Sequence, residues 1–157
     1  MGQKLGVPIL APAAVPVANL PKMAIDSIWT SYTLLGEGWG LDAVDMSTIL
    51  SETEYLVQAV WQDKSPDEVS EILANVFALF DTDKNGLIDA LELFVSLALM
   101  SAMTIEQKLD FIFTAYDFEG AKEMTLDEVT ILLRACASGL AKLGAPPLNI
   151  TAKEVDT

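Results

Sequence analysis

The sequence predicts an all-α protein in which pairs of helices enclose short acidic loops. Apolar residues recur at helical spacing in six segments: 24–34, 44–62, 65–80, 90–103, 104–117 and 126–139. No stretch alternates apolar and polar residues as a β-hairpin would, beyond short pairing between loops. The length of 157 residues suits one domain with arms and is enough to bury a core.

Composition excludes several classes of function. The net charge of −14 argues against binding to nucleic acid or to anionic membranes, and it favours cations or a basic partner. Cys136 is the only cysteine, so no internal disulfide can form, which predicts a reducing compartment such as the cytoplasm. Histidine is absent, which removes the commonest general base. We therefore expect no catalytic residues and no enzymatic activity.

Residues 1–21 form a predicted N-terminal arm. Its four prolines forbid a helix and favour extended, polyproline-like backbone, yet it is apolar and nearly uncharged. Two interpretations stay open: a floppy terminus, or a peptide that packs into a groove on its own domain or on a neighbour. The candidate partner-binding residues come from this arm and from helix 90–103: Val7, Ile9, Leu10, Val15, Val17, Phe94, Leu97 and Met100.

No membrane anchor is strongly indicated. No run of eighteen apolar residues is present, so we expect no transmembrane helix. Gly2 is followed by Gly6 where an N-myristoylation signal favours Ser or Thr, so lipidation stays open on an incomplete pattern.

Helix boundaries are well marked in the second half of the chain. Ser65 is an expected N-cap with Pro66 in the first turn, and Thr104 is an expected cap for the following helix–loop–helix unit. Gly139 is expected to stop the last helix. The predicted division is an arm, a helical pair, a pair of helix–loop–helix units and a tail, at residues 1–21, 22–64, 65–138 and 139–157.

Loop 81–92, "DTDKNGLIDALE", carries the strongest motif. Asp81, Asp83, Asn85, Gly86 and Glu92 fit D-x-[DN]-x-[DN]-G-x5-E, with a helix on either side. This pattern resembles the EF-hand superfamily. The expected Ca²⁺ ligands are Asp81, Asp83, Asn85, the carbonyl of Leu87, Asp89 directly or through water, and Glu92 with both carboxylate oxygens.

Loop 117–128, "DFEGAKEMTLDE", is a degenerate copy. Ala121 offers no ligand oxygen, and Lys122 stands where the turn needs glycine, at a cost on the order of 1 kcal/mol if the turn is kept. We expect a structural partner loop with calcium binding weak or absent, in which Met124 pairs with Ile88. The residues that keep a second site open are Asp117, Glu119, Glu123, Thr125 and Glu128.

A glycine-rich run near residue 36 resembles a third, decayed loop. "GLDAVD" from Gly40 echoes "GLIDALE" from Gly86, with one residue deleted and Asp45 at the closing position. Leu35 would occupy the first ligand position, so it fails as a metal site. A relic of the fold that pairs helices and a coincidence both stay open.

These features predict all-α paired EF-hands, packed on a degenerate helical pair with an extended N-terminal arm. The expected function is a non-enzymatic calcium-binding protein, with one Ca²⁺ site, that acts through protein–protein interaction. The alternative is a calmodulin-like sensor that exposes an apolar groove on binding calcium. Residues 24–140 and the arm also resemble small EF-hand proteins of cilia and flagella, which implies a place in axonemal microtubules beside tubulin.

Overall fold

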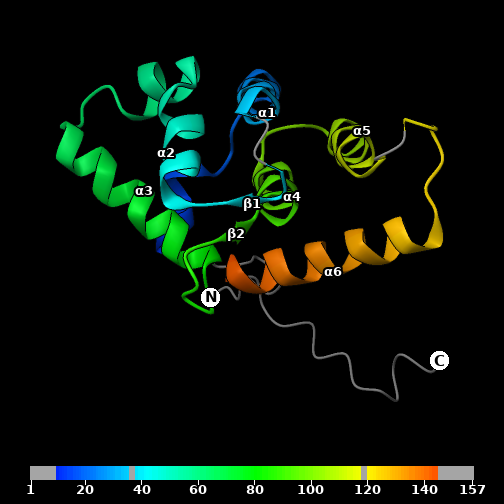
Figure 1. Ribbon diagram of the computed structural model, residues 1–157. Helices are drawn as coiled ribbons and strands as arrows, with labels where there is room; N and C mark the ends of the chain where they lie inside the picture. Colours follow the sequence, from blue (N-terminus) through cyan, green and yellow to red (C-terminus); the bar gives the residue numbers. More distant parts are fainter. Residues whose placement is uncertain (1–9, 36–37, 118–119, 145–157) are drawn as a thin grey trace, which may run out of the picture.

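The computed structural model describes residues 10–35, 38–117 and 120–144 and confirms the all-α prediction (Figure 1). Helices dominate this part of the chain, and one pair of two-residue strands joins two loops. None of the described helices has the length and apolar character needed to cross a membrane. In chain order the elements are η1 (Pro12–Val17), α1 (Lys22–Leu35), β1 (Gly40–Leu41), α2 (Ala43–Ser51), η2 (Leu56–Val60), α3 (Pro66–Phe80), β2 (Ile88–Asp89), α4 (Ala90–Met100), α5 (Ile105–Tyr116) and α6 (Leu126–Lys142).

The two strands join loop 81–92 to the glycine-rich loop. β1 and β2 are antiparallel, with Gly40 opposite Asp89 and Leu41 opposite Ile88. Helix α1 contacts α4 and α2 contacts α3, so the first two helix–loop–helix units form one four-helix body. The glycine-rich run is therefore a structural member of the pair. The expected pairing of Ile88 with Met124 is wrong, because buried Leu41 takes that place.

Helix α4 is the centre of the core. Every residue from Ala90 to Ala98 is buried, because α1, α5 and α6 surround the helix (Figure 1). The ring of Phe94 meets that of Trp29 edge-on at 4.9 Å, and Phe111 of α5 lies 5.7 Å from the same tryptophan. A helix that is apolar all round has this central position.

Capping residues fix where the helices begin. Ser65 and Thr104 accept hydrogen bonds from the backbone N–H groups of Glu68 and Gln107, and each forms a complete capping box, as predicted for the cap positions. Thr125 does the same for α6. The prediction that Gly139 stops the last helix is wrong, since α6 continues to Lys142.

The predicted helix 44–62 is broken. Helix α2 ends at Ser51, and a single π-helical turn, η2, follows at Leu56–Val60. Buried Thr53 donates its hydroxyl hydrogen to the carbonyl oxygen of Ile49 at 3.0 Å. Threonine hydroxyls that bond the preceding turn compete with the backbone ladder, which accounts for a break here.

The described part of the N-terminal arm, residues 10–21, packs on its own domain. Residues 12–17 form a 3₁₀ turn that packs on α3, not the expected extended chain, because 3₁₀ geometry tolerates Pro12 at the start of so short a segment. Ala14 and Val17 of this turn are buried. The backbone N–H of Asn19 donates to the carbonyl oxygen of Met100, so the described part of the arm is fixed in place.

Candidate metal centre

Loop 81–92 is turned by hydrogen bonds from its own backbone to Asp81. The two carboxylate oxygens of Asp81 accept from the N–H groups of Asn85 at 3.1 Å and Gly86 at 3.0 Å. Gly86 has a φ of +84°, in the left-handed region that glycine adopts without steric cost. The backbone thus wraps the loop around the first predicted ligand.

The next two predicted ligands, Asp83 and Asn85, are hydrogen-bonded to each other. Asp83 accepts hydrogen bonds from the Asn85 backbone N–H at 3.3 Å and from its side-chain amide at 3.1 Å. The side-chain oxygen of Asn85 in turn accepts from the N–H of Leu87 at 2.9 Å. The alternating side chains of the loop therefore lie on its inner side, while the Leu87 side chain is exposed.

The far end of the loop is fixed by Asp89 and Glu92. Asp89 caps α4 by accepting from the backbone N–H of Leu91 at 2.8 Å and of Glu92 at 3.2 Å. The Glu92 carboxylate is paired with a lysine from another helix: Nζ of Lys142 lies 2.6 Å from its Oε1. This oxygen is buried and accepts no oriented hydrogen bond within the described residues, so the ion pair compensates its charge.

The loop has the oxygen donors that Ca²⁺ requires. Its Asp side chains accept hydrogen bonds from nearby backbone N–H groups, and Glu92 is paired with Lys142. A cavity of about 420 Å³ is bordered by Asp83, Asn85, Asp89, Glu92 and Lys142 among others. Across residues 10–35, 38–117 and 120–144, no three acidic or cysteine side chains stand close enough to hold a metal ion. All donors are oxygens, which suits Ca²⁺, and the buried Glu92 oxygen faces a cation already.

Loop 117–128 repeats the same backbone turn with poorer chemistry. Asp117 accepts from the N–H groups of Ala121 at 3.1 Å and Lys122 at 2.8 Å, which matches the bonds made by Asp81. Lys122 has a φ of +61°, so the turn is kept at the glycine position with a side chain that disfavours it. An earlier turn at Gly120 does not replace it, because both residues have positive φ.

The other residues proposed for a second site are partly accounted for. Glu128 is buried and accepts from the N–H of Thr125 at 2.8 Å, so both form the cap of α6. Glu123 is exposed, and Glu119 lies outside the described residues. Calcium binding here stays a prediction of weak or absent affinity.

Comparison with known proteins supports the metal chemistry. A stretch of 81 residues, 52% of this chain, is 31% identical to Calcium-binding protein J of Dictyostelium discoideum and covers 42% of that protein. The chain is similar to calcium-binding proteins. A stretch of 101 residues, 62% of the chain, is likewise 31% identical to Calcium-binding protein K of the same organism and covers 52% of it.

The likeness is partial. The chain spans about half the length of these relatives. No protein-family model matches the sequence.

Three of the eight partner-binding candidates are buried inside the domain. Val17, Phe94 and Leu97 are buried in the chain's own core, which corrects their assignment to a surface. Leu10 and Met100 are half-buried, and Val15 is exposed. Val7 and Ile9 lie outside the described residues.

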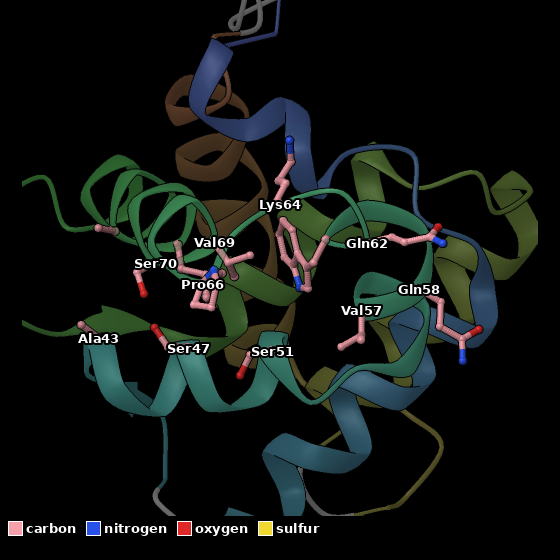
Figure 2. A pocket seen from close by; sticks show the side chains of 13 residues that line it. Ala43, Ser47, Ser51, Val57, Gln58, Gln62, Lys64, Pro66, Val69 and Ser70 are labelled. Atoms are coloured by element: carbon pink, nitrogen blue, oxygen red, sulfur yellow. The ribbon is translucent and has the colours of Figure 1, made fainter.

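A groove between α2 and α3 was not predicted. Figure 2 shows Ala43, Ser47 and Ser51 of α2 facing Pro66, Val69 and Ser70 of α3, with Val57 and Gln58 at one side. The groove encloses about 1010 Å³, and Trp61 forms part of its wall. The indole N–H of Trp61 is buried and has no hydrogen-bond partner among the described residues.

Lys142 and Trp61 are the two site residues that sequence reasoning missed. Lys142 lies 50 positions after Glu92 in the sequence and belongs to no motif. Trp61 falls at the end of a helix that the apolar spacing wrongly extends. A positive residue in the last turn of a helix was the available signal for Lys142, and it is unspecific.

Proposed function

We propose that this protein binds one Ca²⁺ in loop 81–92 and acts, without catalysis, through contact with another protein. The observation that carries the proposal is the loop itself. Asp81 is held by two loop N–H groups, Gly86 makes the left-handed turn, and the oxygen donors follow in the required order. The similarity to two calcium-binding proteins supports the same metal.

The residues that would hold Ca²⁺ are those of the motif. Asp81, Asp83 and Asn85 supply side-chain oxygens, and Leu87 supplies its carbonyl. Glu92 closes the shell, and Asp89 contributes directly or through water while it caps α4. A divalent cation bound here neutralises carboxylates that otherwise repel one another.

Calorimetric titration of the full chain with calcium tests the metal site. One Ca²⁺ per chain is expected, and Asp81→Ala or Glu92→Gln should abolish the heat of binding. Asp117→Ala is the matched control, because Asp117 holds its loop with the same pair of bonds and should leave the stoichiometry at one. Absence of binding at millimolar calcium in the wild-type protein would overturn the proposal.

The groove between α2 and α3 supports the protein-contact part. Val57, Val69 and Leu73 give it an apolar lining, and its walls are two of the helices that the β1–β2 pair links. An apolar segment of a partner protein suits such a surface. A lysine or glutamate at Val57, which is exposed, should remove partner binding without disturbing the core.

A calcium sensor is the second candidate, because α2 and α3 flank the same paired loops. Fluorescence of an apolar-surface dye with and without calcium separates the two. A large calcium-dependent rise supports the sensor, while an unchanged signal supports a permanent contact.

We also propose a cytoplasmic location and an axonemal role beside tubulin. The location rests on cysteine usage and the axonemal role on the resemblance alone. Incorporation of the tagged chain into isolated axonemes tests the latter, and a purely cytosolic distribution in ciliated cells would contradict it.

A further inference from the structure

The ammonium group of Lys142 stands at the junction of both ends of the calcium loop. Its Nζ lies 2.6 Å from Glu92 Oε1 and donates a hydrogen bond to the carbonyl oxygen of Phe80 at 2.9 Å. Phe80 is the last residue of α3, and Glu92 lies in the first turn of α4. The side chains of Lys142 and Glu92 are only 17% and 11% exposed, so water screens their attraction weakly.

Packing of α6 on α4 places Lys142 there. Gly139 of α6 lies against Ser96 and near the backbone oxygen of Glu92, where any side chain would meet Ser96 Oγ. Lys142 follows one helical turn later, on the same face. In Figure 1 the C-terminal end of α6 reaches the junction of α3 with its loop, and buried Leu143 accepts a hydrogen bond from the N–H of Ala11.

Glu92 cannot serve both cations fully. A glutamate that closes a calcium loop gives both carboxylate oxygens to the ion. Oε1 is the oxygen that Lys142 contacts, and it has no other partner within the described residues. A lysine ammonium and a divalent ion at one carboxylate repel each other, so one must leave.

We propose that Lys142 is a tethered competitor of Ca²⁺: it occupies Glu92 in the metal-free protein, and calcium binding expels it and loosens the end of α6. This inference rests on the proposed calcium site and names its regulation. It makes Lys142 a determinant of calcium affinity that lies outside the loop. Because the coupling is reciprocal, anything that lifts α6 from α4 tightens calcium binding by the same factor.

Cys136 supplies a reporter on the same helix. It is the only cysteine of the chain, lies within α6, and packs half-buried against the core. Burial raises the pKa of its thiol, so it reacts slowly while α6 is seated. Its rate of reaction with dithiobis(nitrobenzoate) therefore measures how firmly α6 is held.

The test compares four full-length proteins by calcium titration and by Cys136 reactivity: wild type, Lys142→Gln, Lys142→Arg and Arg134→Gln. Arg134 is exposed on the same helix, so its substitution makes the same change in net charge away from the loop. Lys142→Gln should bind calcium roughly 5- to 150-fold more tightly than Arg134→Gln, the range typical of coupled sites. Lys142→Arg, which keeps the positive charge, should stay near the wild type.

Cys136 should react several-fold faster with calcium in the wild type, and fast with or without calcium in Lys142→Gln. Circular dichroism checks that each variant is folded. If Lys142→Gln and Arg134→Gln bind calcium with equal affinity, or Lys142→Gln binds it more weakly, the competition is overturned but the calcium site is not. A wild-type Cys136 rate that calcium does not change overturns the loosening of α6. If no folded variant binds calcium, the proposed function itself fails, whereas binding by Lys142→Gln alone supports both.

Discussion

Leu41 and Ile88 lie opposite each other across the β1–β2 pair and are 0% and 3% exposed. They join the glycine-rich loop to loop 81–92, which carries the predicted metal ligands. The glycine-rich loop therefore acts as the structural partner of loop 81–92, and the third helix–loop–helix unit packs on this body through α5 and α6.

Truncating either partner should destabilise the whole domain. Leu41→Ala and Ile88→Ala should each lower the free energy of unfolding by about 2–5 kcal/mol, because each leaves a cavity in the core. The double variant should lose less than the sum, since the two side chains share one contact. Urea unfolding followed by circular dichroism measures all three.

Two control variants accompany this comparison of single and double variants. Leu87→Ala removes a neighbouring side chain that is 53% exposed and should cost little. Met124→Ala combined with Ile88→Ala should be additive, because β2 pairs with β1. Coupling between Met124 and Ile88 of the size found for Leu41 would contradict the observed register.

The contact of Gly139 with Ser96 gives a second prediction. Gly139→Ala should lower the free energy of unfolding by about 1–3 kcal/mol, since the new Cβ meets Ser96 Oγ. Ser96→Ala removes that oxygen, which is buried without a hydrogen-bond partner among the described residues, and should be neutral or stabilising. The double variant should recover most of the loss in a thermal unfolding assay; no recovery would place the strain elsewhere.

The Ser65 cap of α3 should affect the stability of the fold but not its affinity for calcium. Ser65→Ala removes one acceptor of the capping box and should cost about 1 kcal/mol. Ser65→Asp keeps an acceptor and should retain most of the stability. Calorimetry should give the same calcium affinity for both variants, because Ser65 lies at the opposite end of α3 from the loop; an altered affinity would argue against independent roles.

The left-handed backbone at Lys122 predicts a stabilising substitution. Lys122→Gly should raise the free energy of unfolding by about 1 kcal/mol, since glycine adopts a φ of +61° without the penalty of a side chain. Gly86→Ala, at a φ of +84° in the first loop with open space around it, should have the opposite effect. Chemical unfolding of the pair measures both signs, and a destabilised Lys122→Gly would show that the lysine side chain makes compensating contacts.

Tyr116 makes stability depend on pH in alkaline solution. Burial raises the pKa of its hydroxyl above the ordinary value of 10.0, with smaller effects from Asp89, Cys136 and Glu92. The neutral form is thus favoured in the folded state, so this contribution is present below pH 10 and is lost as the pH rises above it. Stability should fall by up to about 1.4 kcal/mol per pH unit there. Tyr116→Phe should flatten the slope in urea titrations from pH 9 to 12, and an unchanged slope would assign it to other groups.

The sequence predicted helix starts correctly where hydrogen bonds between residues close in the chain determine them. Ser65 and Thr104 mark helix starts because their side chains bond neighbours three residues away. The break after Ser51 was missed, because a back-bond from one buried threonine outweighs a continuing apolar pattern.

The order of the loop donors was also predictable, since the motif is contiguous. Its partner was not: spacing between repeats favoured loop 117–128, while burial of Leu41 decided for the glycine-rich loop. Lys142 could not be found either, because only the packing of α6 on α4 brings it to Glu92.

The central place of α4 has a consequence during synthesis. A ribosome releases α4 before α5 and α6, the two helices that pack most extensively against it. The faces of α4 that α5 and α6 cover, including the one where Ser96 meets Gly139, are therefore exposed on the nascent chain until those helices emerge. Chains that stall in this interval present one of the most apolar surfaces of the protein to chaperones and to each other.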